Sequence, residues 1–494
     1  MEICLISLIE DVGCTNLRYL SSYIRSHGHT TKLVFLPRLF SEGWPENESY
    51  KYPYSRDVLQ QIEEISRDSD LVGLSLMTCH LDNAIHVTNY LKQTGKTVIW
   101  GGVHPTINPQ ECLDFADLVC VGEGECKTVE LLDRMEEGHL PEDIQVNGIL
   151  TRRNRQLTAG RVVHDLDELG FPDFDMTHQY MLYEGSVVQL DKDNFSTYLN
   201  HCYRTSLSRG CAYACTYCCN NVFKQLDDGK VKKIRWRSID DQIEELKYAS
   251  TLVSNLSQID FSDDTFLARP YEKIEEFAAR YKEEVGVGFR ILSSPLSITY
   301  EKVKVLADAG LQLIGMGVQS AYEPVRKIYK RRESLEQIKR ASEVIRKVSD
   351  ETGKRITVRY DFIIDNPWGG EKDVEESIRF AMTLDKPLVL SIFSLVFYPG
   401  TELYRKAKEE GLINDELNEI YRVTQLLPKP TYMNNVFMLL GLGCPKWIVK
   451  IFLRRNMGMK SVRLAQFLCR YVIKYPATIR FFLFERFRNN RRAI

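Results

Sequence analysis

The sequence predicts an α/β protein with three parts: a doubly wound parallel sheet, a partial (β/α)6 barrel and a basic, helical C-terminal region. Short β-rich apolar runs alternate with amphipathic stretches of helical length over most of the chain, which is typical of βαβ units. Glycine, polar residues and cysteine gather where these runs end. We therefore expect a doubly wound domain over 1–150, a linker over 151–195, the barrel over 196–425 and the C-terminal region over 426–494.

Length and composition allow two or three globular domains. The chain has 494 residues, of which 44% are hydrophobic and 27% charged, and this is ordinary globular usage. Its 13 cysteines are mostly scattered singly and the N-terminus shows no secretory signal, so we expect a cytoplasmic protein without a disulfide framework. No uninterrupted apolar stretch reaches about 18 residues, which argues against a membrane-spanning helix.

The N-terminal sheet is predicted from five apolar runs. Ligands of doubly wound sheets bind beyond the carboxyl ends of the strands. Three of the runs lead into loops rich in glycine and polar residues, which begin at Ser75, Gly101 and Val121. Glycine lets a flat ligand approach the backbone there. The five runs are Ile3 to Ser7, Lys32 to Phe35, Leu71 to Leu76, Thr97 to Trp100 and Leu118 to Val121.

The barrel is predicted from a second series of apolar runs. After the linker, in which Pro172 imposes an extended path, the alternation of strand and helix resumes near residue 200. The active groups of such a barrel lie at the carboxyl ends of its strands. The six runs are Ser206 to Ser208, Gln258 to Phe261, Gly288 to Leu292, Leu313 to Val318, Val358 to Ile364 and Leu388 to Val396.

The most specific motif is a group of cysteines directly after the first barrel strand. Cys211, Cys215 and Cys218 form a CxxxCxxC array on one short loop. Three thiolates can ligate three irons of a [4Fe-4S] cube and leave the fourth iron open to an exogenous ligand. A structural zinc site is the alternative, but it needs a fourth ligand, and no second CxxC or HxxxH pair follows. Cys219, next in the chain, is interpreted as a packed thiol.

This array, with Tyr217 before its last cysteine, resembles the signature of the radical S-adenosylmethionine (SAM) superfamily. The resemblance implies that SAM chelates the open iron and that an external donor, such as a flavodoxin or ferredoxin, supplies an electron for its cleavage. Later strand ends, in Asp260-Phe-Ser-Asp-Asp and Gly317-Val-Gln-Ser-Ala, resemble SAM-contacting elements of the same family. The positions carried over for SAM binding are Tyr217, Asp263, Asp264, Arg290, Ser293, Gln319, Ser320 and Arg331.

Some of these positions have simpler alternatives. Asp263 or Asp264 can be a helix N-cap, which is a common role for aspartate. Arg331 and its neighbour Arg332 are both candidates for the contact with the SAM carboxylate, and either can be a solvated helix-end arginine.

The three N-terminal loops, placed before such an array, resemble the Rossmann-like cobalamin-binding domain of B12-dependent radical SAM enzymes. The resemblance covers about residues 1 to 150 and implies that the loops line the corrin ring and its tail. No DxHxxG segment is present, so we expect no histidine placed by that motif to ligate cobalt. His104 is expected either to contact the corrin or to be a hydrogen-bonded turn residue. The positions carried over are Ser75, Thr78, Gly101, Gly102, His104, Glu123 and Gly124.

Two positions depart from the family's pattern. Gly170 stands in the linker segment where the family commonly has proline. Asp365 replaces the glycine that the family usually has in the turn after the fifth barrel strand. This aspartate puts in doubt a close approach of the backbone to the adenosyl group at that turn.

The C-terminal region is strongly basic. Residues 441–494 carry 13 Lys or Arg against one acid, Glu485, a charge of +12 that leaves −14 for the rest of a chain whose net charge is −2. Apolar and basic residues interleave from Trp447 to Phe487, which predicts helices able to lie at the inner face of a membrane. The equal alternative is a helical cap that packs on the protein. Nucleic acid is not expected as a partner.

Taken together, the resemblance implies a cobalamin-dependent methyltransferase with a [4Fe-4S] cluster, SAM and cobalamin. In that family a 5′-deoxyadenosyl radical abstracts hydrogen from an unactivated carbon, and methylcobalamin delivers a methyl group to it. The alternatives are radical SAM chemistry that forms carbon–carbon bonds or rearranges the substrate, with or without cobalamin, and a non-catalytic cobalamin-binding or redox regulatory protein. The sequence identifies neither the catalytic residues nor the substrate, which we expect to be a small molecule or a lipid.

Overall fold

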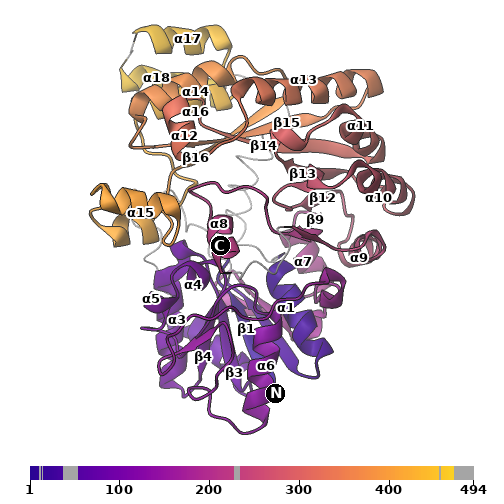
Figure 1. Cartoon of the computed structure of the whole chain (residues 1–494), viewed down its shortest axis with the longest axis vertical. Coiled ribbons are helices and arrows are strands. Elements are labelled where there is room, and N and C mark those ends of the chain that lie inside the picture. The colour runs from indigo at the N-terminus through magenta and orange to yellow at the C-terminus, as the bar shows by residue number, and fades with distance from the viewer. Residues whose placement is uncertain (10–12, 14, 37–53, 227–233, 456–457, 472–494) are drawn as a thin grey trace. The chain divides into compact units, whose positions relative to one another are not determined.

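The computed structural model describes residues 1–9, 13, 15–36, 54–226, 234–455 and 458–471. It confirms the predicted α/β class with parallel sheets. The described residues divide into two compact units, the first built from Met1–Ser257 and Phe397–Val423 and the second from Gln258–Val396 and residues 424–471 (Figure 1). The cysteine loop therefore belongs to the same unit as the N-terminal sheet. The domain boundaries near 150, 195 and 425 stay predictions.

The first unit is built around an eight-stranded sheet with the order β6-β5-β4-β3-β1-β2-β7-β8. All five predicted runs form strands, β1 to β5, and pair in parallel, with Ile3 opposite Leu71 and Ser75 opposite Gly101. β7 continues the parallel pairing, whereas β6 and β8 are antiparallel to their neighbours. The strands are β1 (Glu2–Ser7), β2 (Thr30–Phe35), β3 (Leu71–Ser75), β4 (Val98–Gly101), β5 (Leu118–Cys120), β6 (Ile149–Thr151), β7 (Gln179–Tyr183) and β8 (Ser186–Gln189).

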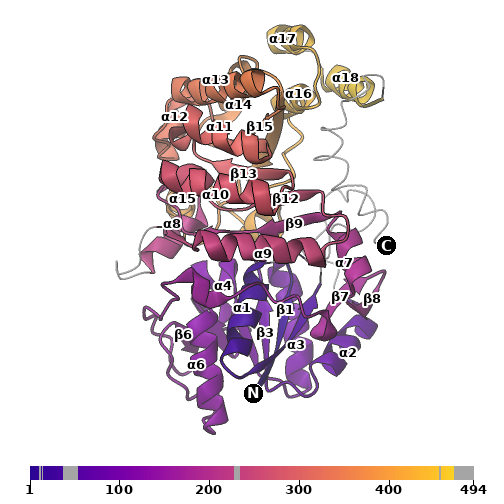
Figure 2. The same cartoon turned by 90° about the vertical axis from the view of Figure 1, so that its right-hand side faces the viewer.

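Helices cover both faces of this sheet. α1 and α6 pack together, as do α2 and α3, and the two pairs lie on opposite sides of the strands (Figures 1 and 2). The face under α2 and α3 holds a large apolar core, in which the indole of the fully buried Trp100 donates to the Thr88 hydroxyl at 2.8 Å. The helices are α1 (Thr15–Ser26), α2 (Arg56–Ile65), η1 (Thr78–His80), α3 (Leu81–Gln93), α4 (Val103–Ile107), α5 (Pro109–Cys112) and α6 (Glu125–Glu136).

Further elements of the first unit carry the chain through the linker and the cysteine loop. In place of the first predicted barrel strand, Ser206 to Ser208, the structure has two short strands: β9 ends just before the predicted run, and β10 begins at its last residue. The elements are η2 (Leu166–Leu169), η3 (Met176–His178), α7 (Lys192–Tyr198), β9 (Cys202–Thr205), β10 (Ser208–Arg209), α8 (Cys219–Gln225), β11 (Arg235–Trp236), α9 (Ile239–Leu252), α15 (Glu402–Glu409) and the single π-helical turn η6 (Leu417–Tyr421).

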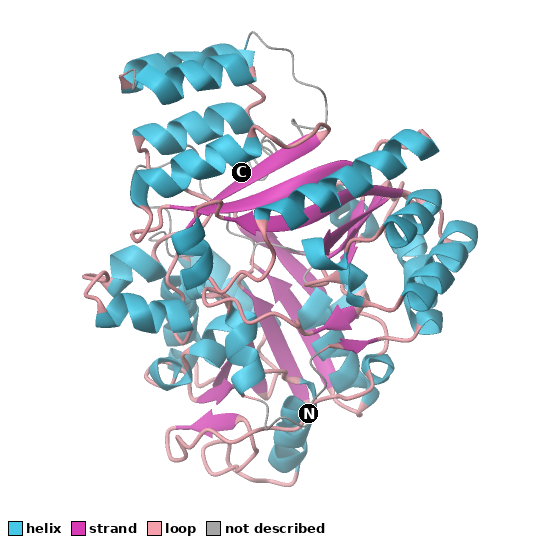
Figure 3. Ribbon diagram, turned by 45° about the horizontal axis from the view of Figure 1, so that its top comes forward, coloured by secondary structure: helices cyan, strands magenta, loops and turns pink. Residues whose placement is uncertain are grey.

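The second unit contains the other five predicted barrel strands, β12 to β16. They are consecutive parallel neighbours, each followed by helical segments (Figure 3). The strands are β12 (Gln258–Phe261), β13 (Phe289–Ser293), β14 (Leu311–Gln319), β15 (Thr357–Ile364) and β16 (Leu388–Ser394). The helices are η4 (Phe266–Ala268), α10 (Tyr271–Glu284), η5 (Pro295–Ser297), α11 (Tyr300–Ala309), α12 (Glu323–Ile328), α13 (Leu335–Thr352), α14 (Gly370–Ala381), α16 (Tyr432–Gly441), α17 (Lys446–Arg455) and α18 (Met459–Tyr471).

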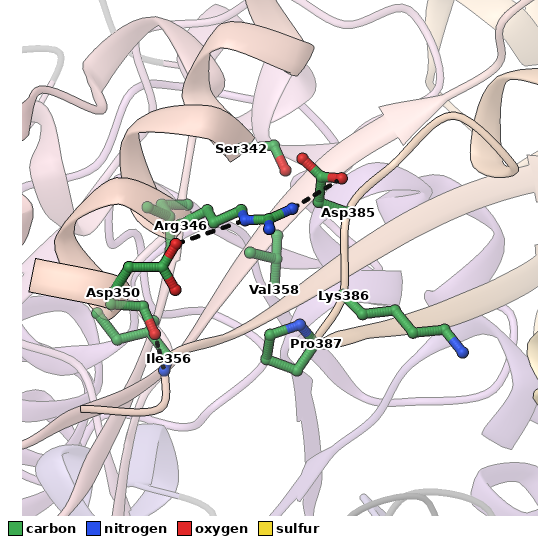
Figure 4. A pocket seen from close by; sticks show the side chains of 10 residues that line it. Ser342, Arg346, Asp350, Ile356, Val358, Asp385, Lys386 and Pro387 are labelled. Atoms are coloured by element: carbon green, nitrogen blue, oxygen red, sulfur yellow. Dashed lines mark hydrogen bonds and ion pairs between the residues drawn. The ribbon is translucent and has the colours of Figure 1, made fainter. Parts of the chain in front are cut away.

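A small cavity lies at the amino ends of β15 and β16 (Figure 4). Arg346 of α13 crosses it and pairs with Asp385 at 3.1 Å and with Asp350 at 3.6 Å. In barrels of this kind, the amino ends of the strands serve stability and the carboxyl ends carry the active groups. We therefore interpret the cavity as structural.

Asp365 connects the barrel strands to the C-terminal helices within the second unit. Its backbone is left-handed, with φ at 64°, which aspartate tolerates better than most residues. Its carboxylate accepts from the Ser394 hydroxyl at 2.7 Å, the Lys429 backbone N–H at 2.9 Å and the Asn434 amide at 2.6 Å. The aspartate keeps the conformation that suits glycine and uses its side chain to hold the end of β16 and the start of α16.

We expect Asp365→Gly to destabilise the protein although glycine suits the left-handed backbone at this position. The glycine relaxes the backbone but removes an ionised acceptor with three donors, so the free energy of unfolding should fall by about 3 kcal/mol. Denaturant unfolding and limited proteolysis between 424 and 434 measure this. The control is Asp350→Asn, which alters the exposed Arg346 pair and should change stability by less than about 0.5 kcal/mol. Unchanged stability and proteolysis of Asp365→Gly would contradict the anchoring role.

Candidate active site

The cysteine array lies on a tight loop between β10 and α8 in the first unit. Gly210, with φ at 102°, turns the chain out of β10. The Cys218 N–H donates to the Cys215 carbonyl at 3.2 Å, which closes a turn, and Cys218 then caps α8. The Lys224 ammonium of α8 donates back to the Tyr213 carbonyl. None of the three thiols takes part in a disulfide, and all three are half-buried, as ligands of a cluster that must admit an exogenous molecule should be.

The arrangement of the thiols fits a cluster better than a single ion. Within the described part of the chain, the one group of His, Cys, Asp and Glu whose ligand atoms converge within 4.8 Å is His29, Asp133 and Glu136. The array cysteines are not in it. A tetrahedral zinc ion needs its ligands around one point, whereas a [4Fe-4S] cube places each thiolate on a different iron. The donor set therefore fits the cube, and the assignment of Cys211, Cys215 and Cys218 as its ligands stays a prediction.

Cys219 has surroundings of its own. It begins α8 and is half-buried. Burial raises the pKa of the Tyr398 phenol, and the charges of Cys79 and Cys219 raise it further, so both thiols lie near this tyrosine. Tyr398 belongs to the segment that returns to the first unit, and Cys79 belongs to the loop after β3. This placement agrees with the interpretation of Cys219 as a packed thiol.

The loops after β3 and β4 touch backbone to backbone. The Leu76 N–H donates to the Gly101 carbonyl at 3.1 Å, and the His104 N–H donates to the Leu76 carbonyl at 3.2 Å. Gly102 has φ at 97°, and a Cβ there would lie 3.0 Å from the backbone N and O of Leu76. Glycine is thus required at 102 for the close approach of the two loops.

The third loop, after β5, is joined to the other two. The Thr106 hydroxyl donates to the Gly102 carbonyl at 2.6 Å and accepts from the Gly122 N–H at 3.0 Å. Five of the seven positions predicted for cobalamin are partly exposed in these loops: Ser75, Gly101, Gly102, Glu123 and Gly124. The loops therefore form one continuous polar surface at the carboxyl ends of β3, β4 and β5.

Two buried histidines mark this surface. The His80 Nδ1 accepts from the Met77 N–H at 3.3 Å, so its proton resides on Nε2, which is buried and has no hydrogen-bond partner among the described residues. Burial lowers the pKa of both His80 and His104 to about 4, so both rings are neutral at physiological pH. An orphaned buried N–H beside glycine-rich loops fits a surface that receives a large polar cofactor. Sequence analysis missed His80, whose only signal was its place beside Thr78.

His104 lies beneath the loops rather than on their exposed side. It is fully buried, with Nδ1 3.3 Å from the Thr78 hydroxyl and Nε2 3.8 Å from the Glu111 carboxylate. Its ring meets the edge of Tyr421, whose hydroxyl donates to Glu111 at 2.8 Å. Of the two expected roles, this geometry supports the hydrogen-bonded turn residue. Thr78 is also buried, so a direct contact of either residue with cobalamin stays a prediction.

The predicted SAM residues other than Tyr217 belong to the second unit. Most of them lie at or just after the carboxyl ends of its strands, but Arg290 is the second residue of β13 and Arg331 lies between α12 and α13. Asp263 is buried, and its carboxylate lies 3.8 Å from the guanidinium of Arg269. Asp264 is exposed. Arg290 lies 3.7 Å from Asp260 across β12 and β13. The Ser293 hydroxyl at the end of β13 is buried and has no hydrogen-bond partner in the part of the chain that the structure describes. An orphaned hydroxyl at this strand end fits a ligand that brings its own polar groups.

Gln319 is held in a strained conformation. Its φ is 66°, in the left-handed region that non-glycine residues seldom occupy, and it follows an irregularity in the pairing of β14 with β15. Its side-chain amide lies over Gly317, where any Cβ would collide with it. Arg331 also holds the backbone at Gly317, because its guanidinium donates to the Gly317 carbonyl at 2.7 Å. The guanidinium is itself paired with the buried Glu333. Strain of this kind is concentrated at binding sites, which supports the prediction for Gln319.

Ser320 is engaged inside the fold. Its hydroxyl is fully buried, donates to the Asp373 carboxylate and accepts from the Tyr322 N–H at 2.9 Å. Burial raises the pKa of Asp373 to about 7. Within the fold, these bonds of Ser320 fix the turn that carries Gln319, and the predicted contact of Ser320 with SAM stays a prediction.

Two sequence families account for most of the chain. Residues 5–132 match the family model of the B12 binding domain, and residues 205–380 match that of the radical SAM superfamily. Both ranges agree with the segments in which the motifs were found. The chain belongs to the radical SAM superfamily, and within it to the enzymes that carry a B12-binding domain.

Several known proteins resemble this chain over most of its length. Bacteriochlorophyllide d C-8(2)-methyltransferase of Chlorobaculum tepidum is 23% identical over 376 residues, which are 73% of this chain and 73% of that protein. The radical SAM methyltransferase TsrM of Kitasatospora setae superposes with a TM-score of 0.62 at 14% identity, over 84% of this chain and 77% of TsrM. The cobalamin-dependent SAM radical enzyme OxsB superposes with a TM-score of 0.64 at 16% identity, over 99% and 75%. These superpositions confirm the predicted fold.

The cysteine assignment predicts that the triple variant Cys211→Ala/Cys215→Ala/Cys218→Ala holds no cluster. Anaerobically reconstituted wild type should contain about four irons and show thiolate-to-iron charge-transfer absorption, and the variant should lose both, because no thiolate remains on the loop. Cys219→Ala is the matched control and should retain wild-type iron and absorption. A triple variant that kept its iron, or a Cys219→Ala variant that lost it, would contradict the assignment.

Proposed function

We propose that this protein is a B12-dependent radical SAM methyltransferase that adds a methyl group to an unactivated carbon atom. One observation carries the proposal: the loop with the three thiols and the three loops suited to cobalamin belong to a single compact unit. Two cofactors with separate tasks can be used in one reaction only if the protein holds them together. The methyltransferase activity of the Chlorobaculum tepidum relative supports the choice of methyl transfer.

The residues of the chain have distinct tasks in this proposal. When bound, the cluster and SAM supply a 5′-deoxyadenosyl radical and cobalamin supplies the methyl group. Cys211, Cys215 and Cys218 hold the cluster and leave one iron for SAM. Gln319 and Ser293 offer hydrogen bonds to SAM from the ends of β14 and β13. The neutral rings of His80 and His104 keep the floor of the cobalamin loops uncharged.

The product assay separates this proposal from its alternatives. Protein with a reduced cluster, hydroxocobalamin, methyl-deuterated SAM and a metabolite extract should form 5′-deoxyadenosine and S-adenosylhomocysteine in comparable amounts, together with a product that carries the label. A flavodoxin or ferredoxin serves as reductant. The triple cysteine variant is the control and should form no deoxyadenosine. Formation of 5′-deoxyadenosine without S-adenosylhomocysteine would indicate rearrangement or carbon–carbon bond formation. The absence of both products would refute radical SAM catalysis.

We also propose that α17 and α18 place the enzyme at an anionic membrane surface. Residues 441–471 carry seven Lys or Arg and no acid. Large apolar side chains are exposed among them: Trp447 is 65% exposed, Ile451 37% and Leu464 59%. Val449 and Phe452, on the other face of α17, are buried, so one face of the helix packs on the protein and the other remains available. The predicted cap and the predicted membrane face can therefore coexist on one helix.

No helix of the described residues is both long and apolar enough to cross a bilayer. The part of the predicted basic region over 472–494 lies outside the described residues. A surface contact through α17 and α18 would rest on about 1 kcal/mol for each basic residue near anionic headgroups, in addition to burial of the exposed aromatic and aliphatic groups.

Co-sedimentation with liposomes tests the membrane contact. The full chain should sediment with vesicles that contain phosphatidylserine, less at high salt, and remain in the supernatant with neutral vesicles, because the attraction is electrostatic. The double variant Trp447→Gln/Ile451→Gln changes only exposed side chains and should bind several-fold more weakly. Leu296→Gln, at an exposed leucine of the second unit, is the matched control. Equal recovery of the wild type and the double variant with vesicles would count against the helical face, and no sedimentation of either would refute the contact.

A further inference from the structure

Two arginines face each other across the short ribbon that frames the cysteine loop. β10 leads into the loop and β11 follows α8, and the two strands pair antiparallel with Arg209 directly opposite Arg235. Like charges at directly opposite positions destabilise an antiparallel pair. Only Gly210 separates Arg209 from Cys211. The ribbon that positions the first cluster ligand therefore needs negative charge from elsewhere in the protein.

The negative charge comes from the loop after β5. Glu123 accepts from Arg209 at 3.0 Å with one carboxylate oxygen and from Arg235 with the other. Glu125, the first residue of α6, accepts from Arg209 at 2.7 Å. Arg235 also donates to the Val163 carbonyl in the linker. Two positive and two negative charges are thus balanced at the junction of the third cobalamin loop, the linker and the cysteine ribbon.

The two glutamates differ in their access to solvent. The side chain of Glu125 is 5% exposed and that of Glu123 is 28% exposed. Burial would lower the pKa of the Arg209 guanidinium, but the charges of Glu125 and Glu123 raise it above its ordinary value, so the group stays ionised. Glu125 is therefore the fixed member of the network. Glu123 is the member that a ligand at the end of β5 can contact, and it is shared between both arginines.

We infer that Arg209, Arg235, Glu123 and Glu125 form a positioning network that couples the cobalamin loop to the cluster loop. A cofactor that contacts Glu123 changes how this carboxylate is shared between Arg209 and Arg235. This change shifts the position of the ribbon that carries Cys211. Cobalamin and the cluster then affect each other's binding, because coupling between two sites is reciprocal. The inference rests on the proposed function in requiring that both cofactors bind.

The test measures hydroxocobalamin affinity of the full chain with and without the cluster. In the wild type the two dissociation constants should differ by about tenfold, which lies in the usual range of coupling between sites. The EPR spectrum of the reduced cluster should also change when cobalamin is added. In Glu123→Gln the iron content should be retained, the ratio of the two constants should fall to about one, and the spectrum should no longer respond to cobalamin.

A second variant guards against simple misfolding. Glu123→Gln leaves an excess positive charge, so Glu123→Gln/Arg235→Gln, which removes one charge of each sign, is made in parallel and should show the same loss of coupling. The matched control is Glu137→Gln at the other end of α6, where Glu137 forms an exposed pair with Arg134 at 3.3 Å. This control should keep the tenfold ratio.

The outcomes are distinct. Cobalamin binding with equal affinity in the presence and absence of the cluster in the wild type would overturn the inference and leave the proposed function standing. Wild-type coupling that survived in both Glu123 variants would also overturn it, since the network would then only support the fold. A wild type that bound the cluster but no cobalamin would refute the proposed function, and the inference with it.

Discussion

The ion pairs of Arg209 and Arg235 with Glu123 and Glu125 are the contact on which the candidate site most depends. They fix the start of the cysteine loop against the sheet whose loops are suited to cobalamin. Buried pairs of this kind add little net stability compared with apolar residues, but removing one partner costs about 3–5 kcal/mol, because a charge is left uncompensated. The main role of the network is therefore to position the cysteine loop. Two cofactors that act in one reaction require such fixed positions.

The sequence predicted those parts of the fold that are encoded locally. The five N-terminal runs match β1 to β5 because buried parallel strands appear as short apolar runs. The CxxxCxxC array was found in the same way, since its ligands lie within eight residues of each other. The first barrel strand was misplaced because β9 and β10 are only four and two residues long, too short for a clear apolar pattern.

What the sequence could not reveal was the use of each polar residue. Glu123 was assigned to cobalamin, yet its carboxylate binds arginines 86 and 112 positions away in the chain. Ser320 was assigned to SAM, but its hydroxyl is bound to Asp373, which lies 53 positions further on. Asp365 was noted as a departure, and only the structure shows that its acceptors hold α16. Such partners are set by tertiary packing, so a single sequence carries no local signal for them.

The buried histidines of the cobalamin loops make this part of the first unit sensitive to acid. Both pKa values are lowered by burial to about 4, whereas an unfolded histidine titrates near 6.5. As the pH falls below about 6.5, the unfolded chain therefore takes up protons before the folded loops do, and the free energy of unfolding decreases until the pH approaches 4. The Glu111 carboxylate lies beside His104, but it can form an ion pair with the ring only when His104 is protonated. Burial of the ring opposes this protonation. Acidification thus acts on the loops after β3 and β4, whereas small changes near neutral pH leave both histidines uncharged.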